Sequence, residues 1–401
     1  MAGHVQEAVS PEAAGLLAAV IELQPAIREA SNQIEKERCL PPVLVQQLKR
    51  TGVFRMTMPR SWGGTELDPV SQLQVLEELS YADGSVGWCA TIGCDSGYLS
   101  AYLEQAEARE MFDVDTITAG NLARAAGQAR RVEGGYRVTG RWPFASGCRH
   151  ADWMIASCLV YEGDAQMMNE HGAPVTRVCF LRPDQCQIID TWNTIGLRGT
   201  GSNDFTATDV FVPKSHSLNY QSLKPLRPEP LYLFPGFIAG KFGAVPLGVA
   251  RAALDATIEL ARRSSARAAI KADRFIPRHP LIEESHMQIG IAQAEALIGS
   301  ARSYLYDRTA RVWQQLVSGG RPSPAEMARH SIAYINAYKT CREAIDQLYS
   351  LAGAAVVYAS SPLDRLLRDM HTMAQHVVAG PLSFEIAGRM LLGAEPVRMF
   401  I

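Results

Sequence analysis

The sequence changes its character twice, and these two changes divide the chain into three parts. From about residue 118 to residue 217 it consists of short runs rich in β-branched and aromatic residues, separated by glycine and proline. These runs are residues 135–138, 153–161, 175–181, 186–190 and 205–212. Such spacing predicts a small antiparallel barrel or sandwich. We therefore expect a central β domain at residues 117–218, between helical domains at residues 1–116 and 219–401.

Apolar residues recur at helical spacing on both sides of this β segment. In residues 11–115 the clearest examples are Leu16, Leu17, Val20, Ile21, Leu23, Ile27 and Ile34. After a connector dense in proline, four long helices are predicted at residues 241–272, 280–316, 324–353 and 362–392. Four long antiparallel helices joined by short turns form a bundle. The predicted fold class is therefore α+β, with an all-α N-terminal domain, a central antiparallel β-barrel or sandwich and a C-terminal four-helix bundle.

Charge and composition argue against several classes of partner. The formal net charge is -2 and the pI is about 6.5, which gives no basic field for nucleic acid or anionic lipid. The most apolar long window, residues 234–254, is interrupted by Lys241, Pro246 and Arg251, so we expect no membrane span. The first residues lack a basic and apolar leader, and we expect a cytoplasmic protein.

The cysteines do not indicate a metal site or a disulfide framework. All eight are scattered, without a C-x-x-C pair or a histidine at zinc-ligand spacing. We expect them to be reduced and mostly buried, and we expect no metal. Cys148, two residues after Ser146, could instead be a nucleophile, but no activating base stands near it in the sequence.

His376 is the first candidate for chemistry. Pro362 belongs to a helix start signal, so we expect His376 to lie on the helix that follows. At about 100° per residue, Asp369 and Thr372 fall on the same face as His376, and His371 is turned about 140° away. The two histidines are therefore not expected to share a metal. An imidazole suits proton transfer near neutral pH, although a lone histidine is as readily an inert core or surface residue.

Two upstream segments are candidates for binding a ligand. Residues 142–147 (WPFASG) end a strand in a turn, where backbone amides and the Ser146 hydroxyl are free to reach a ligand. Residues 197–202 (LRGTGS) are glycine-rich, so their amides can approach an anion or a flat ring closely. An ordinary turn serine is the alternative for Ser146. No dinucleotide fold with the G-x-G-x-x-G spacing is evident, so electrons would have to come from elsewhere.

Residues 134–147, 191–204 and 368–376, in this order, resemble the flavin-dependent monooxygenases built on the acyl-CoA dehydrogenase fold. The resemblance runs from about residue 23 to residue 392. It implies an enzyme that hydroxylates a phenol, an indole or an amine through a flavin C4a-hydroperoxide. It also implies FADH2 or FMNH2 and O2 as cofactors, a separate NAD(P)H:flavin reductase as electron donor, and assembly as a homotetramer.

The same resemblance assigns roles to residues. His376 would deprotonate the substrate or orient the peroxide, and Ser146 would hold N5 of the flavin in a dry pocket. The flavin would be contacted by Trp142, Phe144, Ala145, Ser146, Gly147, Arg198, Gly199, Thr200 and Ser202. The substrate pocket would be lined by Trp88, Tyr98, Asn121 and His376. For Trp88, which stands in a run of small residues, close helix packing is the alternative.

Two other functions compete with this interpretation. An acyl-CoA dehydrogenase, which would oxidise an acyl thioester with bound FAD, resembles the chain over the same length. Its catalytic glutamate would fall at about Val377, and Glu385 is a poor substitute two turns farther on. A flavin-binding or structural relative without activity would be favoured if His376 were buried against apolar side chains with no cavity beside it.

Overall fold

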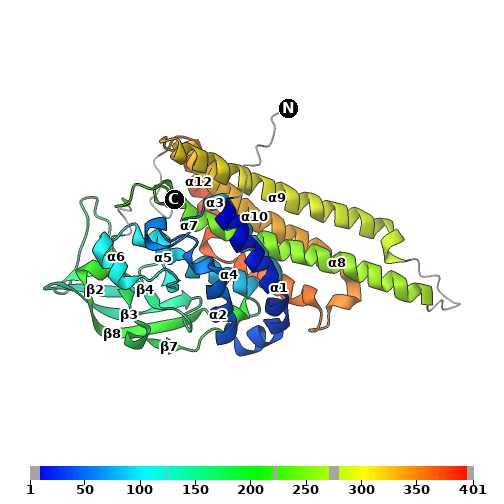
Figure 1. Ribbon diagram of the computed structural model, residues 1–401, viewed down its shortest axis with the longest axis horizontal. Coiled ribbons are helices and arrows are strands. Elements are labelled where there is room, and N and C mark those ends of the chain that lie inside the picture. Colours follow the sequence, from blue (N-terminus) through cyan, green and yellow to red (C-terminus); the bar gives the residue numbers. More distant parts are fainter. Residues whose placement is uncertain (1–9, 123, 220–223, 271–279, 395–401) are drawn as a thin grey trace.

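The sheet lies on one side of the molecule, with the N-terminal helices α5 (Asp95–Ser100) and α6 (Gln105–Met111) beside it, and the long helices α8 (Ala244–Ile270) and α9 (Ser285–Val317) extend to the other side (Figure 1). The computed structural model describes residues 10–122, 124–219, 224–270 and 280–394. Within these ranges the element order is helices, then strands, then helices. The predicted three-part architecture is therefore confirmed. The division at residues 116/117 and 218/219 stays a proposal, and it agrees with the first strand beginning at Thr118 and the last ending at Leu218.

The described residues of the N-terminal part form six α-helices, α1 (Pro11–Glu37), α2 (Pro42–Thr51), α3 (Pro69–Ala82), α4 (Gly84–Gly93), α5 (Asp95–Ser100) and α6 (Gln105–Met111). Of these, α1 to α4 have clear start signals. Ser10 caps α1 by accepting a hydrogen bond from the Ala13 amide at 3.2 Å. Asp83 caps α4 in the same way, accepting from the Ser85 amide at 2.9 Å and the Val86 amide at 3.2 Å. Asp83 is buried, so this cap lies inside the molecule.

The central part is one nine-stranded sheet with the order β7-β8-β3-β2-β4-β6-β9, in which β1 and β5 also pair with β4. The strands are β1 (Thr118–Asn121), β2 (Gly127–Val132), β3 (Gly135–Ala145), β4 (Trp153–Glu162), β5 (Ala165–Gln166), β6 (Thr176–Leu181), β7 (Gln187–Ile189), β8 (Asn203–Pro213) and β9 (Ser217–Leu218). The sheet is mixed rather than purely antiparallel, because β1 and β2 both pair with β4 in parallel. The expected antiparallel arrangement is corrected in this respect.

The C-terminal part contains three long helices, α8 (Ala244–Ile270), α9 (Ser285–Val317) and α10 (Pro324–Ala352). The last predicted helix, residues 362–392, is in fact two helices, α11 (Pro362–Met373) and α12 (Pro381–Leu391), joined through the 3-10 turn η11 (Val377–Ala379). Gly380 is extended, with φ −75° and ψ 161°, as the residue before a proline prefers to be. The Gly380-Pro381 pair was the sequence signal for this break.

One apolar core joins the N-terminal helices to the bundle. It contains Ile27 and Ile34 of α1, Leu76 of α3, Leu247 of α8 and Met370 of α11. The helical stretch Gly236–Arg263 is long and apolar enough to span a membrane by composition, but 83% of its most apolar window is buried inside the fold. Its apolar character is therefore that of a core helix, in agreement with the expectation of no membrane span.

Candidate active site

Trp142 belongs to the core of the sheet. Its indole is fully buried, stacks on Phe205 with ring centroids 5.0 Å apart, and donates from Nε1 to the Ser157 carbonyl at 2.8 Å. The Trp142 side chain therefore packs within the sheet. A contact between Trp142 and the flavin stays a prediction.

The register of β3 against β8 shifts immediately after Trp142, and this irregularity brings the following residues to the strand end. Phe144 has a positive φ of 62°, which is unusual for a bulky residue, and its ring is 57% exposed. Ala145 is buried, and Gly147 has a φ of 77° and donates its amide to the Thr200 carbonyl at 2.8 Å. The turn thus presents one exposed aromatic ring above a closely packed backbone.

Ser146, Ser202 and Thr200 form a connected row of buried hydroxyls. The Ser146 and Ser202 oxygens are 2.6 Å apart, and the Ser202 and Thr200 oxygens are also 2.6 Å apart. Thr200 then donates to the Leu197 carbonyl at 2.8 Å. Three of the predicted flavin contacts are therefore brought together, although the two segments are 56 residues apart at the first link.

Arg198 and Gly199 face α1. Arg198 donates to the Glu35 carbonyl at 3.3 Å and to the Thr194 carbonyl at 2.6 Å. A Cβ on Gly199 would lie 2.0 Å from Cγ2 of Ile34, so the glycine permits the loop to approach the helix. Both residues fix the loop in place, and a direct flavin contact for either stays a prediction.

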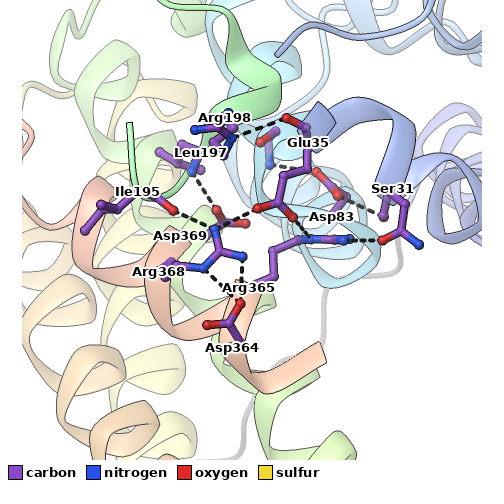
Figure 2. Close-up of polar contacts among 12 residues, drawn as sticks. Ser31, Glu35, Asp83, Ile195, Leu197, Arg198, Asp364, Arg365, Arg368 and Asp369 are labelled. Atoms are coloured by element: carbon purple, nitrogen blue, oxygen red, sulfur yellow. Dashed lines mark hydrogen bonds and ion pairs between the residues drawn. The ribbon is translucent and has the colours of Figure 1, made fainter. Parts of the chain in front are cut away.

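Asp369 ties the same loop to α11 (Figure 2). Its Oδ1 accepts a hydrogen bond of 2.5 Å from the amide of Leu197, whose φ is 48°. A Cβ on Gly196 would lie 2.1 Å from the Arg368 carbonyl oxygen, so the loop backbone rests directly on the helix backbone. Burial, and next the charge of Asp83, raise the pKa of Asp369 to about 7.

Ion pairs surround this junction (Figure 2). Glu35 of α1 bonds Arg365 at 2.7 Å and Arg368 at 2.8 Å, and Arg368 also donates to the Ile195 carbonyl at 2.6 Å. A cavity of about 10 Å³, the size of one water molecule, lies between Asp83 and Asp369. The loop of residues 195–198 thus forms one polar junction with α1, α4 and α11.

His376 does not lie on a helix, which corrects the prediction from sequence. Helix α11 ends at Met373, and His376 is the residue before η11, with its Nδ1 accepting from the Val378 amide at 3.4 Å. Its ring is half-buried, and burial lowers its pKa to about 4. The imidazole is therefore neutral at physiological pH. Because Nδ1 accepts a hydrogen bond, the ring hydrogen is on Nε2.

Two aromatic rings contact His376. Phe242 of the 3-10 turn η8 (Lys241–Gly243) stacks on it with centroids 5.3 Å apart, and Trp88 of α4 meets it edge-on at 5.1 Å. Trp88 also donates from Nε1 to the Ser146 oxygen at 3.2 Å. Trp88 therefore connects the two segments predicted to carry the chemistry. Phe242 was missed, because no local pattern brings residue 242 next to residue 376.

The other predicted residues lie around this cluster or away from it. Tyr98 is buried and donates to Gln72 Oε1 at 3.0 Å. Lys241 separates Tyr98 from Phe242, with its Nζ 5.9 Å and 5.0 Å from the two ring centroids. Asn121, half-buried at the end of β1, accepts from the Ser157 hydroxyl through its carbonyl at 2.9 Å. A role for Tyr98 or Asn121 in the substrate pocket stays a prediction.

Cys148 and His376 bear on two alternatives raised by the sequence. Burial raises the pKa of the Cys148 thiol, and its sulfur lies 3.4 Å from the Gly201 carbonyl, which argues against a nucleophile. His376 lines neither the 10 Å³ space beside Asp369 nor the groove of about 900 Å³ between α9 and α10. Its imidazole contacts the rings of Phe242 and Trp88.

Comparison with known proteins decides the family. Residues 10–107 match the acyl-CoA dehydrogenase N-terminal domain, and residues 241–381 match the acyl-CoA dehydrogenase C-terminal domain. The indole-3-acetate monooxygenase of Pseudomonas putida is 30% identical over 375 residues, which cover 92% of this chain and 92% of that protein. The chain belongs to the flavin-dependent monooxygenases of the acyl-CoA dehydrogenase fold.

A second relative and a solved structure extend the comparison. The oxygenase subunit HsaA of Rhodococcus jostii (strain RHA1) is 31% identical over 373 residues, covering 90% of this chain and 93% of that protein. The crystal structure of 3-HSA hydroxylase from Rhodococcus sp. RHA1 has a TM-score of 0.86 at 25% identity, covering 96% of this chain and 99% of that chain. The predicted fold, enzyme class and flavin dependence are thereby confirmed.

The two positions considered for the catalytic glutamate of an acyl-CoA dehydrogenase do not support that alternative. Val377, where the glutamate of a dehydrogenase would fall, is 45% exposed and begins η11. Glu385 is exposed on α12. Neither position therefore supplies a buried carboxylate to abstract a proton from a thioester. The inactive alternative is likewise displaced, because the family is one of monooxygenases.

Proposed function

We propose that the chain hydroxylates a small aromatic substrate of the phenol or indole type, or an amine, with reduced flavin delivered by a separate NAD(P)H:flavin reductase. The observation that carries this proposal is the position of Trp88, which bonds Ser146 at 3.2 Å and contacts His376 at 5.1 Å. Relatives named indole-3-acetate monooxygenase and resorcinol hydroxylase, oxygenase component, support an aromatic substrate and a two-component system.

The residues at the end of β3 fit a flavin. The exposed ring of Phe144 offers an apolar face to a flat ring, and the Ser146 hydroxyl beside it offers a hydrogen bond to the ring edge. Reduced FAD or FMN bound here would supply the oxygen activation, so that RH, O2 and reduced flavin give ROH, water and oxidised flavin. Trp88 and Phe242, which are both buried, would keep water away from the reacting centre.

His376 would orient the substrate. A neutral imidazole with its hydrogen on Nε2 donates a hydrogen bond to a phenolate, a phenol oxygen or a peroxide oxygen. Its pKa of about 4 makes it a weak base at neutral pH, which favours the orienting role over deprotonation. Phe242 and Trp88 would hold the imidazole in place and stack against an aromatic substrate.

We also propose a cytoplasmic homotetramer. Exposed apolar side chains support burial by further copies of the chain: Ile195, Val357, Tyr358 and Leu392. Light scattering at micromolar concentration should give four times the mass of the chain. A monomer would contradict this proposal.

The function can be tested with the purified chain, a flavin reductase, NADH and a panel of phenols, indoles and aromatic amines. Mass spectrometry should find one product that is 16 mass units heavier than its substrate, with the added oxygen coming from 18O2. The competing activity is tested without O2. Bleaching of bound oxidised flavin by an acyl-CoA would show a dehydrogenase and refute the proposal.

A further inference from the structure

The hydroxyls of Thr200 and Ser202 have a direction that can be worked out atom by atom. A hydroxyl carries one hydrogen, so it can donate only once, and a carbonyl oxygen can only accept. Thr200 Oγ1 lies 2.8 Å from the Leu197 carbonyl oxygen, so the hydrogen of Thr200 points to Leu197. The 2.6 Å contact between Thr200 and Ser202 therefore takes its hydrogen from Ser202.

The direction continues to Ser146. Because the Ser202 hydrogen points to Thr200, the 2.6 Å contact between Ser202 and Ser146 takes its hydrogen from Ser146. Trp88 Nε1 can only donate, and it donates to the Ser146 oxygen at 3.2 Å. Ser146 thus has its single hydrogen engaged and one of its two lone pairs occupied. What remains for a further ligand is one lone pair, which accepts.

Leu197 fixes the end of this hydroxyl chain, which runs from Ser146 through Ser202 and Thr200 to the Leu197 carbonyl. This carbonyl also accepts from Trp192 Nε1 at 2.9 Å. The Leu197 amide is held by Asp369 at 2.5 Å, a bond drawn in Figure 2. The loop cannot move away from α11 without breaking this bond. Leu197, Thr200, Ser202 and Ser146 are all buried, so water does not compete for the hydroxyl hydrogens.

We propose that this one-way hydroxyl chain selects the redox state of the flavin, with Ser202 and Thr200 as positioning residues. N5 of reduced flavin carries a hydrogen and donates, whereas N5 of oxidised flavin has a lone pair and accepts. The lone pair left on Ser146 can accept a hydrogen bond from N5 of reduced flavin, whereas it repels the lone pair on N5 of oxidised flavin. The site therefore favours reduced over oxidised flavin before any reaction with oxygen. This inference rests on the proposed contact between Ser146 and the flavin.

The experiment measures flavin binding in the absence of substrate. Dissociation constants of reduced FMN and FAD are determined anaerobically, those of the oxidised forms in air, and their ratio is compared between variants. Ser202→Ala frees the hydrogen of Ser146, which can then turn to N5 of oxidised flavin. The preference for reduced flavin should fall on the order of 10-fold, as expected when a buried group changes from mismatched to paired.

Thr200→Val is a second variant of nearly unchanged shape. Without the Thr200 oxygen, Ser202 can donate to Ser146 and release the Ser146 hydrogen, so the preference should fall in the same direction. Thr191→Val is the matched control, because the Thr191 hydroxyl lies in the same region but donates to Asp204 at 3.0 Å, outside the chain. Its ratio should equal that of the wild type.

The outcomes separate this inference from the proposed function. An unchanged ratio in both folded variants, with wild-type melting temperature and circular dichroism, would overturn the hydroxyl chain alone. Ser146→Ala with wild-type affinity for both redox forms would overturn the contact on which the inference rests. A wild-type chain that binds neither reduced FMN nor reduced FAD would overturn the proposed function itself.

Discussion

Removing the charge of Lys241 should destabilise the fold strongly, because its partner is buried with it. Lys241 Nζ lies 2.6 Å from Asp95 Oδ1, and the two side chains are 2% and 6% exposed. Lys241→Met keeps the length of the side chain and leaves a carboxylate without its partner in the core. Breaking a buried pair from one side costs about 3–5 kcal/mol, and we expect a loss of this size in the free energy of unfolding.

The measurement is urea denaturation at fixed protein concentration, followed by tryptophan fluorescence, for the wild type, Lys241→Met, Asp95→Asn and the double variant. The double variant should be more stable than Lys241→Met, because no unpaired charge is left in it. Burial raises the pKa of Asp95, and Lys241 opposes this shift. In Lys241→Met the pKa of Asp95 should therefore rise further.

This pKa shift gives the prediction a pH dependence with a definite sign. In Lys241→Met, Asp95 of the folded state takes up a proton at a higher pH than Asp95 of the unfolded state, whose pKa is about 3.9. The free energy of unfolding of the variant therefore rises as the pH falls toward that value. The difference in the free energy of unfolding between the variant and the wild type should become smaller as the pH falls from 8 to 5. A difference that is equal at both values, or a double variant no more stable than Lys241→Met, would refute the argument.

Three further predictions follow from other parts of the structure. His376→Ala should lower hydroxylation by roughly 10²- to 10³-fold, as the loss of one positioned hydrogen-bond donor does, and raise hydrogen peroxide release. His376→Gln, which can still donate, should keep more activity, and equal losses in the two variants would favour a base. His371→Ala should keep most of the activity, because that ring bonds Asp346 at 2.7 Å, away from the site. His330→Leu should stabilise the fold by about 1–3 kcal/mol in urea, since both ring nitrogens are buried without a partner among the described residues. Burial lowers the pKa of His330 to about 4, so this gain should grow as the pH falls from 6.5; a gain independent of pH would contradict it. Gly199→Ala places a methyl group 2.0 Å from Ile34 and should lower the free energy of unfolding by about 1–3 kcal/mol in thermal denaturation. Adding Ile34→Ala to this variant should restore part of the lost stability, and no recovery would refute the packing role.

The sequence predicted the features that are local and periodic. The three-part order followed from the change between helical and strand spacing, and the long helices α8, α9 and α10 were each placed to within a few residues. The predicted position of His376 was wrong because the apolar spacing continues through 362–392, and the Gly380-Pro381 pair, which begins α12, was overlooked.

The features that could not be predicted depend on contacts between distant residues. Trp142 looks like an accessible residue at a strand end, yet Phe205, 63 positions later, covers its face. The bond between Leu197 and Asp369 spans 172 residues, and that between Trp88 and Ser146 spans 58. Only the resemblance to a family brought these segments together, and it did so without saying which atoms meet.

The ion pairs between α1 and α11 have a consequence for how the chain is made. Arg365 bonds Asn32, which precedes it by 333 residues, and Glu35, which precedes it by 330 residues. At about 5–20 residues per second, a ribosome needs tens of seconds to reach the partner of the first helix after making it. During that interval Glu35 has no arginine of α11 to contact. The C-terminal end of α1 should therefore be more sensitive to proteases in nascent chains that stop before residue 360, and become protected once α11 has left the ribosome.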